Sequence, residues 1–549
     1  MNATADWQSA QLRWYEVLTT ILLATLVYVY LFGFGTLVPT NDTWLLQGDP
    51  AQHYLGWQFF RQEGWQWPPG RIAAFGYPFG TAIVFTDSIP LLALLLKPIA
   101  SLLPAKFQYF GLWMLACYAL NGYFGLRLIS RSTTYPALRI IAASFFILSP
   151  PVLLRGYGHE ALMAHWLVLA SIYTYLRGWS GRGWLLWGVI AALCHPYLLV
   201  MVLGFMVASG VTALCGERAP PSRTVLLQGI SIGLTLIAVM GLAGYFTSSG
   251  SLRADGYGYY NMNMLSLIDP LLGWSRYIRQ QPIHPDYAKL GNFGQYEGFL
   301  YLGAGMIALV LLAVALQMSK PESLARRWWA AVAVAAVFWL LALSNVVTFG
   351  EHVLVTIPLP DALLEALSIF RASGRFGWPA FYLINLAALA LVVQRLSARA
   401  ALVVLGAALV LQVADQREKY SEFRQMFKQR MAWQTPLQSP QWALLAQRAS
   451  ALVIVTPPPD ISVAYIPFAY LAATYRLATN SAQIARNDEV RASTFARSMA
   501  TDLAQGSYDS SILYVISRRD FPANVPPELA SKIIDLDGYL VLPPALQRP

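Results

Sequence analysis

One carboxylate, Asp49, lies in the polar stretch Gly48-Asp49-Pro50-Ala51-Gln52-His53-Tyr54, shortly after the first apolar segment of the chain. Ionisable groups this close to a membrane helix are costly to place and commonly mark functional sites. A carboxylate with access to water can act as general base on a hydroxyl group. Asp before Pro is also a normal helix start, so helix capping is the competing interpretation. We count Asp49 and His53 of the same stretch as candidate catalytic residues.

Two further polar stretches contain candidate catalytic residues. Asp87 stands in Phe85-Thr86-Asp87-Ser88-Ile89-Pro90, where it could instead cap the helix that follows. His159 and Glu160 end the stretch Arg155-Gly156-Tyr157-Gly158-His159-Glu160. This pair could orient a substrate hydroxyl, bind a divalent metal, or simply form a hydrogen bond between its own two side chains. With His165 it does not make the His-Glu-x-x-His zinc pattern, so the sequence indicates no metal centre and no cofactor.

Three arginines are candidates for binding a phosphate. Arg371 and Arg375 lie four residues apart in Phe370-Arg371-Ala372-Ser373-Gly374-Arg375-Phe376, so on a helix they would share one face. Guanidinium groups bind phosphate through two parallel hydrogen bonds. Arginine near a membrane also extends to lipid headgroups, which is the competing interpretation. Arg155 is the third candidate.

Residues suited to binding a sugar occur in two further stretches. Tyr259 and Tyr260 belong to the aromatic and amide-rich run Tyr257-Gly258-Tyr259-Tyr260-Asn261-Met262-Asn263. Such surfaces suit sugar rings, but they also occur in interfacial belts. Glu297, in Gly294-Gln295-Tyr296-Glu297-Gly298-Phe299, could bind substrate or simply favour a helix start.

The elements that position these residues are apolar spans. The 549 residues are 56% hydrophobic and 12% charged, against about 25% charged in soluble proteins, which indicates an all-α polytopic membrane domain. We predict about eleven transmembrane helices: Glu16 to Val38, 107–129, 136–153, 161–176, 183–195, 197–215, 224–246, 298–317, 328–348, 377–394 and 400–414. The apolar stretch Ile89 to Leu103 is short and broken by prolines, so we predict an interfacial helix there.

Charge placement predicts the orientation of these spans. Alternate short loops carry arginine and lysine, as in 127–139 and 318–327, which is typical of cytoplasmic loops. The net charge of +10 is therefore explained by orientation rather than by nucleic-acid binding. The opposite face receives the long loops 39–106, 155–160, 247–297 and 349–376, with most of the acidic residues. Polar groups gathered on one outer face favour an enzyme working at that surface.

The composition changes near Asp415. We predict a transmembrane domain over 1–415 and a small soluble α/β domain over 416–549, outside the membrane. Strands are expected at Ala451 to Thr456 and Ser511 to Ser517, and a strand or a hairpin around Asp537-Gly538 at Ile533 to Leu542. An amphipathic helix is expected at Ile484 to Leu503. The Pro457-Pro458-Pro459 turn lacks a phosphate-binding glycine pattern, so we assign this domain docking or scaffolding.

Together these features resemble the GT-C superfamily of membrane glycosyltransferases, which use polyprenyl-phosphate-linked sugars. The resemblance covers about the first 400 residues. It rests on the Asp49 motif in a first outer loop, the interfacial helix, the number of spans and the outward C-terminal domain. The stretches 294–299 and 370–376 look more like a largely uncharacterised bacterial branch. The chain departs from the superfamily pattern because no second acid adjoins Asp49.

The resemblance implies an inner-membrane enzyme with its active site and C-terminal domain facing the periplasm. It would move a sugar from a polyprenyl phosphate to an envelope acceptor such as lipopolysaccharide or O-antigen, a pilin or another glycan. Asp49 would be the general base, and arginines would stabilise the phosphate leaving group. Membrane lipids are expected partners. A lipid or polysaccharide transporter and a membrane acyltransferase are the alternatives from other classes.

Overall fold

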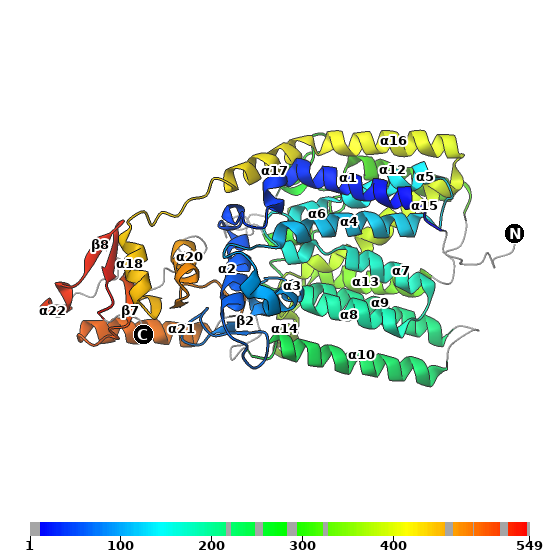
Figure 1. Cartoon of the computed structure of the whole chain (residues 1–549). Helices are drawn as coiled ribbons and strands as arrows, with labels where there is room; N and C mark the ends of the chain where they lie inside the picture. The colour runs from blue at the N-terminus through cyan, green and yellow to red at the C-terminus, as the bar shows by residue number, and fades with distance from the viewer. Residues whose placement is uncertain are drawn as a thin grey trace. The chain divides into compact units, whose positions relative to one another are not determined.

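The computed structural model describes residues 11–215, 221–247, 256–282, 294–321, 328–455, 465–486, 488–516 and 525–545, and helices predominate in it (Figure 1). Two compact units are formed. Unit 1 contains Met1–Leu37, Phe110–Ile237 and Arg253–Phe427. Unit 2 contains Val38–Tyr109, Ala238–Leu252 and Lys428–Pro549. The long first loop thus belongs to the same unit as the C-terminal segment, whereas the sequence suggested a single cut near residue 415.

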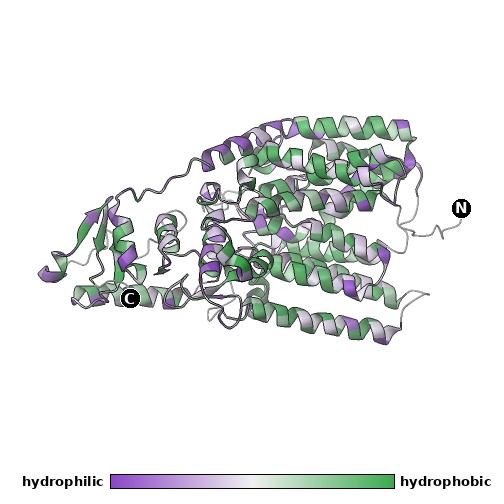
Figure 2. Cartoon of the chain, in the orientation of Figure 1, coloured by the Kyte–Doolittle hydropathy of each residue, from purple (hydrophilic) through white to green (hydrophobic). Residues whose placement is uncertain are grey.

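A helix forms at each of the stretches predicted to be a span. Their bounds are α1 (Trp14–Phe32), α4 (Phe110–Ile129), α5 (Pro136–Ile147), α7 (Trp166–Arg177), α8 (Gly181–Cys194), α9 (Pro196–Leu214), α10 (Ser222–Ala243), α12 (Ala304–Ser319), α13 (Trp329–Leu343), α15 (Trp378–Arg395) and α16 (Ala398–Asp415). Figure 2 shows that these helices are largely hydrophobic, whereas α17 (Arg417–Arg430) is largely hydrophilic.

Length and apolarity single out seven of these segments as able to cross a membrane. Among the described residues they are α1, α4, Pro136–Arg155 (α5 with α6, Pro150–Arg155), α9, α10, Ser373–Arg395 (η9, Ser373–Gly377, with α15) and α16. The helices α8, α12 and α13 are apolar but shorter. The architecture is therefore that of a membrane protein, while the predicted count of eleven crossings is not confirmed.

A glycine contact and a buried ion pair fix the approach of several helices in unit 1. A Cβ added at Gly305 of α12 would lie 2.0 Å from the Ala408 carbonyl oxygen of α16, so only glycine permits this close approach. Arg139 of α5 donates to buried Glu16 at the start of α1 over 3.1 Å. Arg131 donates to the Leu176 carbonyl oxygen of α7 over 3.3 Å. The basic connection 127–139, which was predicted to be cytoplasmic, therefore contacts the start of α1 and the end of α7.

Further short elements of unit 1 complete its loops. These are η1 (Phe34–Leu37), η5 (Glu160–Met163), η6 (Leu271–Gly273), η7 (Gly294–Gly298), the antiparallel strands β3 (Val346–Phe349) and β4 (His352–Thr356), and α14 (Asp361–Ser368).

The first loop of unit 2 is built around one buried helix, α2 (Asp49–Gln62). Its other elements are η2 (Thr43–Leu45), β1 (Arg71–Ile72), β2 (Thr81–Ala82), η3 (Ile83–Phe85), α3 (Pro90–Leu96) and η4 (Lys97–Leu102). Arg61, in the last turn of α2, donates to four carbonyl oxygens between Ala100 and Ala105 and so holds the end of η4. The apolar helical segment Pro90–Leu102 is shorter than the helices able to cross a membrane, and its interfacial location stays a prediction.

The C-terminal part of unit 2 is a mixed sheet with helices. Its strands are β5 (Ala451–Ile454), β6 (Ala478–Thr479), β7 (Ile512–Ile516), β8 (Ile534–Leu536) and β9 (Tyr539–Leu542), in the order β6-β5-β7-β9-β8. β5 runs parallel to β6 and β7, and β9 runs antiparallel to β7 and β8. The β8–β9 turn is Asp537-Gly538, both with positive φ, as a tight two-residue hairpin requires.

The helices of this part are α18 (Gln441–Arg448), α20 (Ile466–Tyr475), α21 (Glu489–Ala504) and α22 (Pro527–Ala530). The strands at 451 and 512 and the terminal hairpin agree with the sequence prediction. The predicted helix from Ile484 begins only at Glu489, because Asp488 caps it by accepting from the Arg491 amide. The proline turn at 457–459 lies outside the described residues.

Candidate functional sites

Three charged side chains meet inside unit 1. Arg155 ends α6, Glu297 lies in η7, and Arg375 lies in η9. Glu297 Oε2 accepts from Arg155 Nη1 over 2.6 Å and from Arg375 Nε over 2.9 Å. Its Oε1 accepts from Arg375 Nη2 over 2.5 Å. The Glu297 side chain is therefore a structural clamp between two arginines, in addition to any contact with substrate.

The cluster is buried and carries an excess of positive charge. The exposed fractions are 1% for Arg155, 3% for Glu297 and 8% for Arg375. Burial alone would raise the pKa of Glu297, but Arg375, Arg155 and, more weakly, His159 outweigh it and hold that pKa well below its usual range. The carboxylate is thus ionised and balances one of two permanently charged guanidinium groups. The net charge of these three side chains is therefore +1, which a bound anion could balance.

Aromatic rings line the two arginines. Arg155 lies over the Trp378 ring at 5.5 Å, and Arg375 lies over the Tyr197 ring at 4.8 Å. The Tyr197 hydroxyl accepts from the Ala372 amide and so anchors the segment before η9. Arg155 Nε has no hydrogen-bond partner within the described parts of the chain. That N–H group is enclosed by protein atoms.

Arg371 and Arg375 do not share a helical face as predicted. Helix α14 ends at Ser368 and η9 begins at Ser373, so Arg371 lies in the intervening turn. Arg371 is exposed, and its guanidinium lies 5.2 Å from the centre of the Tyr260 ring. The two arginines differ in role: Arg375 is bound to Glu297, whereas the Arg371 side chain remains solvent-accessible.

The tyrosine and amide stretch is only partly open to a substrate. Tyr259 and Tyr260 are half-buried and pack edge to face. The amide groups do not face outward as expected of a sugar-binding surface. Asn261 donates to the Val346 carbonyl oxygen, and Asn263 donates to the Gly350 carbonyl oxygen over 2.8 Å. These amides fasten the stretch to the β3–β4 hairpin.

His159 and Glu160 are placed at the start of η5. His159 is half-buried and directly precedes η5, and it contributes weakly to the lowered pKa of Glu297. Glu160 is fully buried, and its carbonyl oxygen accepts from the Trp113 indole over 2.8 Å. His165 is buried and shares a hydrogen bond of 2.8 Å with Tyr382. Within the described ranges no group of three or more His, Cys, Asp or Glu side chains is arranged to hold a metal ion.

Asp49 occupies the first position of α2 in unit 2. Gly48 precedes it with φ of 61°, a conformation that favours glycine, and Pro50 follows at a position suited to a helix start. Asp49 is exposed, in contrast to the buried side chains from Pro50 to Phe60. Tyr465, next to α20, has its pKa raised by burial and by the Asp49 carboxylate. The Tyr465 hydroxyl therefore stays protonated, and it has no hydrogen-bond partner within the described residues.

His53 and Asp87 come from neighbouring segments of unit 2. His53 is buried one turn after Asp49, and its carbonyl oxygen accepts from the Ser88 hydroxyl over 2.6 Å. Gly56 permits this contact, since a Cβ there would lie 2.3 Å from Thr86 Oγ1. Asp87 is half-buried with φ of 51°. Asp87 does not cap α3, because Ile89 occupies the N-cap position and no side chain caps that helix.

A second acid of the first loop, Asp42, is structural. It is 1% exposed, and its Oδ2 accepts from the hydroxyls of Tyr54 and Tyr470, each over 3.0 Å. Lys106 Nζ lies 3.8 Å from Oδ1. Sequence reasoning placed no weight on Asp42. Among the first-loop acids, Asp49 is the exposed one and Asp42 the enclosed one.

Several residues at these sites carried little signal in the sequence. Tyr465 and Tyr470 lie more than four hundred residues after Asp49 and Asp42, in a segment assigned only to scaffolding. Tyr197 follows His195-Pro196, which the sequence analysis treated as a break between helices. An aromatic residue at a proline helix start was the one local feature that could have drawn attention to it.

The helices able to cross a membrane, together with the mixed sheet of unit 2, define a polytopic membrane protein with an additional α/β part. The chain belongs to the family described as "Domain of unknown function (DUF6311)", whose model matches residues 21–417. The model described as "DUF6311 C-terminal domain" matches residues 441–544. No curated protein matches the chain.

Proposed function

We propose that this protein is a membrane glycosyltransferase of the GT-C type, which moves a sugar from a polyprenyl phosphate to a cell-envelope acceptor in the periplasm. The observation that carries the proposal is the buried Arg155–Glu297–Arg375 cluster with one positive charge in excess. A buried uncompensated charge is costly, so a site that retains one is suited to an anionic ligand. A lipid phosphate is the anion that a membrane protein of this composition would meet.

The roles of the three arginines follow from their surroundings. Arg371 is exposed and would contact the phosphate oxygens directly. Arg155 and Arg375 would supply a fixed positive field. Such preorganised charge stabilises a phosphate leaving group as its bond to the sugar breaks. Tyr260, which packs against Arg371, would border the sugar.

Asp49 is proposed as the general base for the acceptor hydroxyl. Its exposed carboxylate can accept a proton, whereas the Asp42 carboxylate is occupied by two tyrosine hydroxyls. In the reaction the acceptor oxygen bonds to the anomeric carbon, the sugar–phosphate bond breaks, the phosphate keeps the electron pair, and Asp49 receives the hydroxyl proton.

The experiment is a transfer assay on the purified full chain in nanodiscs. A panel of polyprenyl-phosphate sugars is supplied with an envelope glycolipid acceptor, and released polyprenyl phosphate is measured by mass spectrometry. Arg371→Ala should weaken donor use about tenfold or more, and Arg371→Lys should restore only part of it. Arg399→Ala, an exposed arginine at the start of α16, is the matched control and should behave as wild type.

Two results would contradict the proposal. If no donor in the panel releases polyprenyl phosphate, the protein is not the proposed transferase. Binding of polyprenyl phosphate without sugar transfer, together with its movement between bilayer leaflets, would favour the transporter alternative.

A further inference from the structure

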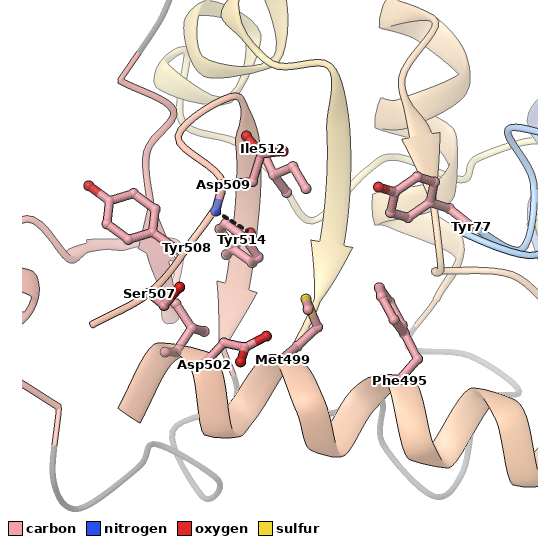
Figure 3. Close-up of a pocket in the computed structure, with 10 residues that line it drawn as sticks. Tyr77, Phe495, Met499, Asp502, Ser507, Tyr508, Asp509, Ile512 and Tyr514 are labelled. Atoms are coloured by element: carbon pink, nitrogen blue, oxygen red, sulfur yellow. Dashed lines mark hydrogen bonds between the residues drawn. The ribbon is translucent and has the colours of Figure 1, made fainter. Parts of the chain in front are cut away.

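A cavity of about 290 Å³ opens in unit 2 beside the sheet. Tyr77 of the first loop forms one wall, and α21 and the segment leading into β7 form the others. Figure 3 shows Met499 and Asp502 rising from α21 toward Tyr514 of β7, and Phe495 rising from α21 toward Tyr77. The rings of Tyr77 and Phe495 lie edge to face, with centres 6.1 Å apart. The first loop and the C-terminal part thus build this cavity together.

The lining combines ring surfaces with groups that bind hydroxyls. Tyr77, Phe495, Tyr508 and Tyr514 supply aromatic rings, and Met499, Leu503 and Ile512 supply apolar surface. Four hydroxyl groups, including that of Ser507, can each donate and accept. Asp502 and Asp509 supply carboxylates, and none of the ten lining residues is basic. This lining disfavours phosphate and other anions.

The two carboxylates keep free acceptor capacity. Asp509 Oδ1 accepts from the amide and hydroxyl of Ser511, each over 2.8 Å, which leaves Oδ2 available. Over the described residues no hydrogen bond or ion pair engages the carboxylate of Asp502, which lies in the last turn of α21. Tyr514 accepts from the Asp509 amide over 3.1 Å, so its hydroxyl proton can be donated elsewhere.

We propose that this cavity binds one or two sugar rings of a neutral glycan, which stack on Phe495 and Tyr77 and donate hydroxyl hydrogen bonds to Asp502 and Asp509. Its size is at the lower end of ligand pockets. The inference rests on the proposed function and deepens it, because it makes the acceptor a carbohydrate held by unit 2. An amine could bind the carboxylates and the aromatic rings, but it would not accept hydrogen bonds from the hydroxyl groups or cover the apolar surface of Met499, Leu503 and Ile512.

The test measures glycoside binding by the full chain in nanodiscs with saturation-transfer difference NMR. The probes are the methyl glycosides of glucose, galactose, mannose and rhamnose at up to about 20 mM, with choline and inorganic phosphate as the amine and anion probes. At least one glycoside should bind. Asp502→Asn, which preserves shape, should weaken binding about tenfold or more, since a hydrogen bond to a charged acceptor is lost.

Two further variants separate binding from folding. Phe495→Leu should weaken binding about threefold to tenfold through loss of the ring. Glu528→Gln removes one exposed carboxylate of the same part of unit 2, outside the cavity, and should leave binding unchanged. Thermal unfolding confirms that each variant is folded.

The outcomes distinguish this inference from the proposed function. Binding of no glycoside, equal binding by wild type and Asp502→Asn, or preference for choline would overturn the glycan site, even if donor turnover is observed. Glycoside binding that depends on Asp502 supports the site. If no polyprenyl-phosphate sugar is then turned over, the glycan site stands and the transferase proposal fails.

Discussion

Glu297 holds two arginines that would otherwise face each other uncompensated in the interior of unit 1. Its carboxylate accepts three hydrogen bonds from them, all within 2.9 Å. We therefore expect this carboxylate to stabilise the fold whether or not it touches substrate. Loss of activity in a Glu297 variant would therefore be a weak argument for a catalytic role, and its effect on stability must be measured first.

We expect Glu297→Gln to lower the free energy of unfolding by about 3–5 kcal/mol, because two buried guanidinium groups lose their counter-charge. Glu418→Gln is the matched control. Glu418 pairs with Arg276 on the surface over 3.9 Å, so its loss should cost at most about 1 kcal/mol. The measurement is thermal unfolding in detergent. Equal midpoints for the two variants would contradict the clamp role of Glu297.

The same carboxylate predicts a dependence on pH. The pKa of Glu297 is lowered by folding, so its contribution is complete above the unfolded value of about 4.3 and is lost as pH falls through the lower folded value. The difference in unfolding midpoint between wild type and Glu297→Gln should be constant from pH 7 to pH 5. It should shrink only in stronger acid. A difference that disappears near neutral pH would mean that Glu297 is not held ionised.

Among the elements, α2 and the segment 86–88 can approach closely because Gly56 has no side chain. Gly56→Ala would place a Cβ 2.3 Å from Thr86 Oγ1 and 2.6 Å from Ser88 Oγ. We expect destabilisation of about 1–3 kcal/mol and displacement of Asp87. Gly229→Ala in α10 is the matched helical control, because nothing lies within 4 Å of its added Cβ. That control should be neutral or stabilise by up to about 1 kcal/mol.

Asp42 joins α2 to α20 within unit 2. Asp42→Asn should increase amide hydrogen exchange in both helices, because it removes the carboxylate that accepts from the hydroxyls of Tyr54 and Tyr470. We expect the loss to lower the local stability by about 1.5–3 kcal/mol. Tyr470→Phe removes one of the two hydrogen bonds and should have a smaller effect confined to α20. Unchanged exchange in Asp42→Asn would show that the two helices are held together by other contacts.

Elements could be predicted from the sequence where a local pattern decides them. Apolar runs ending in basic residues predicted the positions of the unit 1 helices, and the Asp537-Gly538 pair predicted the terminal hairpin. The prediction that Arg371 and Arg375 share one helical face was wrong, because it assumed α-helical spacing, whereas Arg371 lies in a turn. The assembly of unit 2 was not predicted, because its contacts join residues as far apart as Asp42 and Tyr470. No periodic pattern in the sequence predicts contacts between such distant residues.

At the scale of the whole molecule, the orientation of the helices can be tested by reporter fusions. We predict that position 136 lies in the cytoplasm and Pro549 in the periplasm, because the connection 127–139 is basic. Alkaline phosphatase should be active when fused after Pro549 and inactive when fused after Pro136, and a fluorescent protein should show the opposite pattern. Activity of one reporter at both positions would overturn the topology.

In the proposed reaction, Asp49 accepts the proton of the acceptor hydroxyl. The most direct measurement is the rate of polyprenyl phosphate release by purified Asp49→Asn in the transfer assay. Asn starts a helix about as well as Asp, so the variant should fold while its rate falls by about a hundredfold or more. Asp361→Asn, an exposed acid at the first position of α14, should keep the wild-type rate. A folded Asp49→Asn protein with the wild-type rate would contradict the account, and an inactive Asp87→Asn beside it would move the base to Asp87.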